Sequence, residues 1–217
     1  MKKLVFALIS LLIAASASAQ ISFGVMGGLT SSKPNIEKFE PKSANRYHAG
    51  VALRIKTPLP GFVVQPALLY EVQGTSFDKV LEGGKLETIE AEQGYLKLAA
   101  QAQLGTDLLI GRVFGIAEPF VGYGITNEIK QLQKGVDTKT VANDWDYMNK
   151  LHYGVGLGAG VEVLGMVQLS ARYYWNFGKV YNGKDAVSGD DVWKTFQEAM
   201  KTEKPFSGLL ISAAIFF

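Results

Sequence analysis

Apolar and polar residues alternate in eight segments of this chain, and this alternation limits the possible folds more than any other feature. A period of two is typical of β-strands whose two faces meet different surroundings. The strands predicted in this way span roughly residues 21–28, 46–55, 62–72, 95–104, 117–126, 152–163, 167–177 and 207–217.

The links between these segments alternate between short and long. Residues 56–61, 105–116 and 164–166 form short links, whereas the links at 29–45, 73–94, 127–151 and 178–206 are long, polar and charged. Short turns at one end, long loops at the other and an even number of strands are typical of transmembrane β-barrels. The chain is therefore predicted to be all-β, an eight-stranded antiparallel up-and-down transmembrane β-barrel.

The apolar face is predicted to contact lipid. In a soluble, lipocalin-like barrel that face would point inward, but here the opposite face is mostly Gly, Ala, Ser and Gln with few charges, which suits a crowded lumen. When the long loops are placed at the top, aromatic residues of the apolar face gather in the upper half, as amphipathic rings do at a membrane interface. This predicted aromatic girdle comprises Tyr47, Tyr70, Tyr123, Tyr153, Tyr173, Trp175 and Phe177.

The first 19 residues have the features of a secretory signal peptide. Two lysines precede a short apolar stretch, and Ala17-Ser18-Ala19 is a small-x-small cleavage site. A buried N-terminal helix is the alternative. The sequence thus predicts a signal peptide at residues 1–19 and a barrel domain at residues 20–217, exported to the cell outer membrane.

Charge and composition exclude several classes of function. The formal net charge is +2, and residues 1–19 carry two lysines and no acids, so the remainder has a net charge of 2 − 2 = 0. No basic excess indicates nucleic acid as a partner. The chain has no cysteine, which excludes disulfides, thiolate metal sites and thiol catalysis. We expect no cofactor and no metal.

The predicted lumen holds a small set of charged and bulky side chains. Isolated buried ions are costly, so these charges should pair. Glu71 and Lys97, near the top of neighbouring strands, are one expected pair. The full set is Arg54, Glu71, Lys97, Glu162, Arg172 and Tyr174.

Glycine occupies every second position from Gly154 to Gly160, on the lumen face. Paired residues of a hairpin must lie on the same face, so residues 152–163 and 167–177 are predicted to pair such that the two residue numbers add up to 330. This places Gly158 opposite Arg172 and Gly156 opposite Tyr174. Because an eight-stranded barrel is only wide enough for side chains, the glycines are predicted to make room for these two, giving a plugged polar lumen. A small ligand pocket and a conducting path are the alternatives, whereas a dinucleotide fingerprint would require a helix after the glycines.

The last long link contains an amphipathic pattern. At residues 190–200 two acids precede Trp193, Phe196 and Met200 at helical spacing. We expect a short helix that either lies across the barrel mouth or binds another protein or a glycan.

Five stretches resemble the small outer-membrane β-barrel family of Gram-negative bacteria, known as porin-family or PorT-like barrel domains. They are Ala-Ser-Ala-Gln at 17–20, YLKLAAQAQLG at 95–105, PFVGYG at 119–124, YGVGLGAGVEV at 153–163 and the terminal ISAAIFF. The resemblance covers nearly the whole chain after residue 19 and specifies strands and turns. It implies that Phe217 is a C-terminal signal read by the barrel assembly machinery.

His48 and His152 are the side chains suited to base catalysis at neutral pH, and both have lumen parity near the upper rim. Some small outer-membrane barrels modify lipid A. However, no Ser, Asp or Glu forms a convincing catalytic unit with either histidine. We therefore expect no catalytic residues and no enzyme.

The sequence as a whole predicts a structural, interaction or adhesion role at the cell envelope, carried by long extracellular loops. A small pore for solutes and a lipid A-modifying enzyme are the alternatives. The expected partners are outer-membrane lipid and lipopolysaccharide, the barrel assembly machinery and an extracellular or envelope protein.

Overall fold

The computed structural model describes residues 20–33, 42–80, 86–133, 139–142, 145, 149–178 and 207–217. The predicted signal peptide and the expected helix at residues 190–200 lie outside these ranges. The described strands are β1 (Gln20–Lys33), β2 (Lys42–Lys56), β3 (Phe62–Val80), β4 (Leu86–Leu108), β5 (Gly111–Gln133), β6 (Lys139–Ala142), β7 (Leu151–Val163), β8 (Val167–Asn176) and β9 (Ser207–Phe216).

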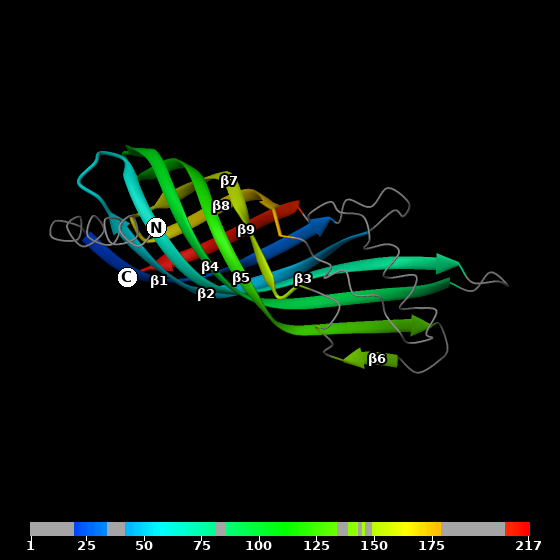
Figure 1. Ribbon diagram of the computed structural model, residues 1–217. Helices are drawn as coiled ribbons and strands as arrows, with labels where there is room; N and C mark the ends of the chain where they lie inside the picture. The colour runs from blue at the N-terminus through cyan, green and yellow to red at the C-terminus, as the bar shows by residue number, and fades with distance from the viewer. Residues whose placement is uncertain are drawn as a thin grey trace, which may run out of the picture.

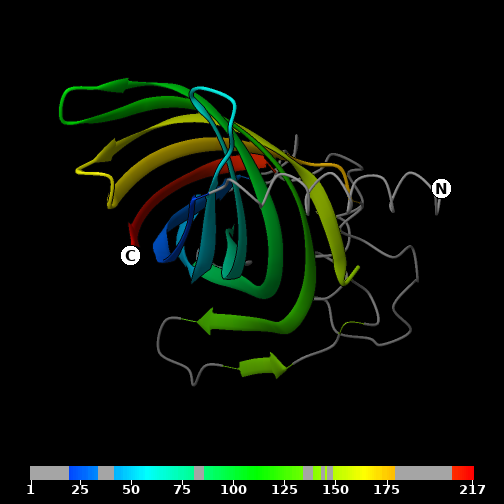
Figure 2. The same cartoon turned by 90° about the vertical axis from the view of Figure 1, so that its left-hand side faces the viewer.

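Eight of these strands close into an antiparallel barrel. Their order is β4-β3-β2-β1-β9-β8-β7-β5, and pairing between β4 and β5 completes the ring. The last strand pairs with the first, with Gly24 opposite Phe216. Figure 2 shows the strands curving around a common centre, and this confirms the predicted fold class.

The apolar face of the barrel is its outer face. In β8 and β9 exposed and buried residues alternate along nearly the whole strand. Leu98 and Ile211 are 54% and 52% exposed, whereas Gln101 is 1% exposed. Polar residues are therefore inside and aliphatic residues outside, which is the reverse of a soluble barrel.

Five strands, β1 to β5, are longer than the sequence predicted, and β3, β4 and β5 are the longest. β3, β4 and β5 have 19, 23 and 23 residues, compared with 13 for β7 and 10 for β8 and β9. Their ends extend past the other strands, away from the C-terminus (Figure 1). The predicted bounds were wrong here, because the backbone ladder continues through polar residues once two strands are in register. The link predicted at 105–116 is reduced to a turn at Leu109–Ile110.

The extension also carries the additional short strand β6, which the sequence did not predict. β6 pairs with Glu128–Gln131 of β5, outside the barrel ring. We call this projecting part of β3, β4, β5 and β6 the arm. It places a four-stranded antiparallel sheet beyond one side of the barrel rim.

The hairpin of β7 and β8 has the predicted register. Gly158 lies opposite Arg172 and Gly156 opposite Tyr174. The connecting turn places Leu164 and Gly165 at positive φ, 53° and 67°. Glycine adopts this left-handed conformation without steric cost.

Candidate functional site

The lumen is the candidate site, and a cluster of contacts around Arg54 of β2, which we call the Arg54 clamp, lies at its lower end. Arg54 Nη1 lies 2.9 Å from Glu162 Oε2 of β7, and both side chains are 5% exposed. The same guanidinium donates to the carbonyl oxygen of Gly165 at 2.8 Å. It also lies 4.6 Å from the ring centroid of Phe216. Arg54 of β2 therefore links β9, the strand that closes the ring by pairing with β1, to β7 in another part of the wall.

Above the clamp lies a cluster of amide side chains from three strands. Gln103 Nε2 donates to Gln65 and Gln101, each at 3.0 Å. Gln103 Oε1 accepts from Arg112 at 3.1 Å and from Gln168 at 3.5 Å. All five residues are at most 5% exposed. Amides that both donate and accept fill most of this level, and the guanidinium of Arg112 also donates to the carbonyl oxygen of Gly61 at 2.8 Å.

The middle of the lumen holds four ionised groups. Lys97 Nζ of β4 lies 2.9 Å from Glu71 Oε2 of β3 and 3.7 Å from Glu118 Oε1 of β5. Arg172 of β8 forms an ion pair with Glu118. All four side chains are at most 1% exposed. The cluster balances two positive and two negative charges, as buried ions require.

His48 lies beside this ion cluster and has hydroxyl partners on both ring nitrogens. Nδ1 lies 3.0 Å from Thr30 Oγ1, and Nε2 lies 2.7 Å from Ser212 Oγ. Arg172 also donates to the hydroxyl oxygen of Ser212. The sequence predicted neither the contact of His48 with Ser212 nor the pairing of Arg172 with Glu118. The first contact joins β2 to β9 and the second joins β8 to β5, and neither pair of strands is consecutive in the chain.

The upper lumen contains a series of aromatic rings that we call the aromatic column. Its neighbouring ring centroids are 6.0 Å apart for Trp145–Tyr95, 4.2 Å for Tyr95–His152, 5.5 Å for His152–Phe120 and 6.2 Å for Phe120–Tyr174. Lys97 Nζ lies 4.2 Å from the centroid of Phe120, a cation–π distance. The column therefore continues into the ion cluster.

The alternating glycines of β7, Gly154 to Gly160, differ in how closely neighbouring atoms approach them. A Cβ on Gly158 would collide with the carbonyl oxygen of Ala171 and crowd Arg172, so this position requires glycine. A Cβ on Gly156 would meet nothing closer than 3.6 Å. The prediction that Gly156 makes room for Tyr174 is therefore wrong: the glycine that Tyr174 lies against is Gly208 of β9.

The outer face presents the aromatic residues that the sequence grouped as a girdle. Tyr47, Tyr123, Tyr153, Tyr173, Trp175 and Phe177 are 40–56% exposed, and Tyr70 is half-buried. Two of the hydroxyls bond other strands: Tyr70 of β3 reaches across β4 to Thr126 of β5 at 3.2 Å, and Tyr173 of β8 donates to Ser207 of the neighbouring β9 at 2.8 Å. Phe217 is 70% exposed, and its ring lies 5.6 Å from that of Phe23 across the closing seam.

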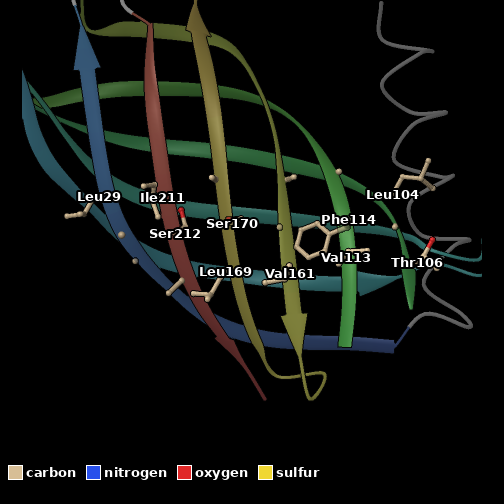
Figure 3. A pocket seen from close by; sticks show the side chains of 18 residues that line it. Leu29, Leu104, Thr106, Val113, Phe114, Val161, Leu169, Ser170, Ile211 and Ser212 are labelled. Atoms are coloured by element: carbon tan, nitrogen blue, oxygen red, sulfur yellow. The ribbon is translucent and has the colours of Figure 1, made fainter. Parts of the chain in front are cut away.

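A hollow of about 930 Å³ is lined by residues of β1, β4, β5, β7, β8 and β9 at one level of the barrel wall. Leu29, Val161, Leu169 and Ile211, on β1, β7, β8 and β9, are 41–59% exposed. Figure 3 shows these side chains on neighbouring strands. The lumen residues Phe114, Ser170 and Ser212, each at most 7% exposed, also line the hollow.

Neither metal chemistry nor a helical membrane span is indicated in the part of the chain described above. No cluster of three or more His, Cys, Asp or Glu residues occurs there that could hold a metal ion. Within the same residues, no helix has the length and hydropathy to cross a bilayer.

A model of the family described as outer membrane protein beta-barrel domain matches residues 14–182. The chain belongs to this family. Its members lie in the outer membrane, so the exposed aliphatic face contacts lipid. Closure of β1 on β9 then satisfies the backbone groups of both edge strands, which hydrocarbon cannot hydrogen-bond.

Two solved structures are similar to this chain at low identity. Neisserial surface protein A has 12% identity and a TM-score of 0.42, with 92% of this chain and 99% of that chain covered. Ail, the attachment invasion locus protein of Yersinia pestis in complex with the heparin analogue sucrose octasulfate, has 11% identity and a TM-score of 0.40, with the same coverage. No curated protein matches the chain.

Proposed function

We propose that this outer-membrane barrel is closed to solutes and acts as a structural or binding element of the cell envelope, without enzymatic activity. The observation that carries the proposal is the filling of the lumen at successive levels. The Arg54 clamp, the amide cluster, the balanced ion cluster and the aromatic column follow one another along the barrel axis. Side chains at each level are almost fully buried. An eight-stranded barrel leaves little space beyond that.

Conductance across a planar lipid bilayer tests closure. Purified protein at pH 7.5 is expected to give no steady current, whereas a sixteen-stranded porin reconstituted in parallel gives open channels. The informative variant is Arg172→Ala, which removes the largest fully buried side chain from the centre. Steady current from the wild type that Arg172→Ala enlarges would show a pore and contradict the proposal.

The binding role is proposed for the arm and the long loops beside it. β4 is ten residues longer than β7, which corresponds to about 30 Å of additional strand. A strand of roughly 9–11 residues already crosses the bilayer, so the arm extends beyond the membrane. Short turns face the periplasm in barrels of this type, which places the arm on the extracellular side.

Site-specific crosslinking in intact cells tests this role. The chain has no cysteine, so one introduced cysteine carries a photocrosslinker at a defined place. Glu128→Cys labels the base of the arm, and Asp107→Cys, at the end of β4 next to the turn on the opposite side, is the matched control. Both positions are exposed. We expect an envelope or extracellular protein to be captured from Glu128→Cys and not from Asp107→Cys. Equal capture from both would contradict the proposal.

The enzyme alternative has one specific observation in its favour. Ser212 and His48 are 2.7 Å apart, which is nucleophile–base geometry. They are 2% and 1% exposed, which argues against access for a lipid. We expect a fluorophosphonate probe to leave folded protein unlabelled and Ser212→Ala to leave lipid A masses unchanged. Labelling that Ser212→Ala abolishes would establish the enzyme instead.

We also propose that residues 1–19 are removed on export. The intact mass of protein purified from outer membranes is expected to correspond to a chain that begins at Gln20. A mass that includes Met1 would contradict cleavage.

A further inference from the structure

His152 lies in the aromatic column with no hydrogen-bond partner for either ring nitrogen among the described residues. The side chain is 4% exposed. Gly122 lies opposite in the ladder, and a Cβ there would collide with the imidazole ring. A neutral ring buries one unsatisfied N–H, whereas a protonated ring buries two and adds a charge. The site therefore accepts the neutral ring much better than the imidazolium.

The charged groups that face His152 do not compensate for a new positive charge. Glu71 on β3 and Lys97 on β4 are the ions that act on the ring, and Tyr95 on β4 covers one face. β5 contributes only the uncharged Phe120 and Gly122. Glu71 is already paired with Lys97 at 2.9 Å. An imidazolium would therefore leave the balanced ion cluster with a surplus positive charge.

His48 provides a natural contrast inside the same lumen. Its two nitrogens lie against the hydroxyls of Thr30 and Ser212. A hydroxyl can accept as well as donate, so both partners of His48 can remain when the ring is protonated. Glu71, Glu118, Arg172 and Lys97 act on His48, so its protonation would also add a charge to a balanced set of ions. The difference lies in the hydrogen bonds: a charged His48 keeps partners in place, whereas a charged His152 has none among the described residues.

We propose that protonation of His152 opens the lumen in acid, because the added charge disrupts both the aromatic column and the ion cluster next to it. The charged ring leaves the aromatic column to reach water, and Tyr95 and Phe120 lose the ring that lies between them. This inference rests on the proposal that the lumen is closed at neutral pH. It adds a condition under which the barrel ceases to be closed.

The size of the effect follows from proton linkage. The hydrated ring of the open form has the ordinary imidazole pKa, about 6.5, while the ring of the closed form stays neutral. The open-to-closed ratio then rises about 30-fold between pH 7.5 and pH 5.0. Below pH 6.5 its logarithm rises by about one per pH unit, because one proton is taken up.

Single-channel recording in planar bilayers at pH 7.5 and pH 5.0 tests the inference on the purified full chain. Wild type and His48→Gln are expected to be silent at pH 7.5 and to show the 30-fold rise at pH 5.0. His152→Phe and His152→Gln are expected to show the same low open fraction at both values. The heat-modified band shift on gels verifies folding, and either His152 variant decides alone if the other does not fold.

Different results overturn different proposals. Steady current from the wild type at pH 7.5 contradicts the closed lumen itself. A wild type that stays silent at pH 5.0, or whose open fraction changes by far less or far more than 30-fold, contradicts the acid opening while leaving closure intact. An equal acid rise in a folded His152 variant assigns the opening to another group and likewise overturns the inference.

Discussion

Replacement of Lys97 by methionine is the sharpest test of how the lumen is held together. Lys97 is fully buried and lies 2.9 Å from Glu71 and 3.7 Å from Glu118. At an effective dielectric constant of about 20, a 2.9 Å pair has a gross Coulomb attraction of roughly 6 kcal/mol. Loss of the desolvation cost of Lys97 itself returns part of this. We therefore expect Lys97→Met to lower the free energy of unfolding by about 3–5 kcal/mol.

Urea unfolding of protein refolded into lipid vesicles measures this loss. The matched control is Arg46→Met, at an ion pair with Glu92 of the same 2.9 Å distance but with side chains 20% and 32% exposed. That pair should contribute less than about 1 kcal/mol. The two variants therefore separate the effect of burial from that of ion-pair geometry.

A second substitution identifies the cause. In Lys97→Met the carboxylate of Glu71 keeps Gln73 as a partner at 2.8 Å but has lost its ammonium partner. Adding Glu71→Gln removes the uncompensated charge, and the coupling energy between the two changes should be about 1–3 kcal/mol. If Lys97→Met costs no more than Arg46→Met, or if Glu71→Gln adds a further loss, the account of the ion cluster is wrong.

Two more contrasts follow from neighbouring positions. Gly158→Ala should destabilise the barrel by about 1–3 kcal/mol, because its methyl group meets the carbonyl of Ala171, whereas Gly156→Ala should be nearly neutral in the same urea titration. Phe216→Ala, at a side chain with no exposed surface, should cost about 3–5 kcal/mol. Phe217→Ala should cost clearly less in purified protein, and an equal loss for both would mean that the seam depends on the outer ring.

Most of what the sequence could predict came from the alternation of apolar and polar residues along each strand. Whether a residue faces lipid or lumen depends only on its position along its own strand, so the pattern placed Leu98, Gln101 and Ile211 on the correct faces. The β7–β8 register followed in the same way, because a short turn joins the two strands. These features are local, and alternation records local structure well.

Contacts across the lumen could not be read from the pattern. Glu118 on β5 receives Arg172 from β8, and His48 on β2 meets Ser212 on β9. Which side chains meet there depends on strand tilt and stagger around the ring, and one strand alone reveals neither. The extra length of β3, β4 and β5 was missed for a related reason: polar residues beyond the membrane carry no alternation of hydropathy.

The interior network also explains how a barrel in lipid can have one register. A slip of β8 by two residues would keep Leu169, Ala171 and Tyr173 on the lipid face, so hydrocarbon would not penalise it. The same slip would move Arg172 away from Glu118 and Ser212, leaving ions buried without partners. The outer face determines that strands form and which way they face. The polar interior determines how they are aligned, so variants of the ion cluster should change alignment and not only stability.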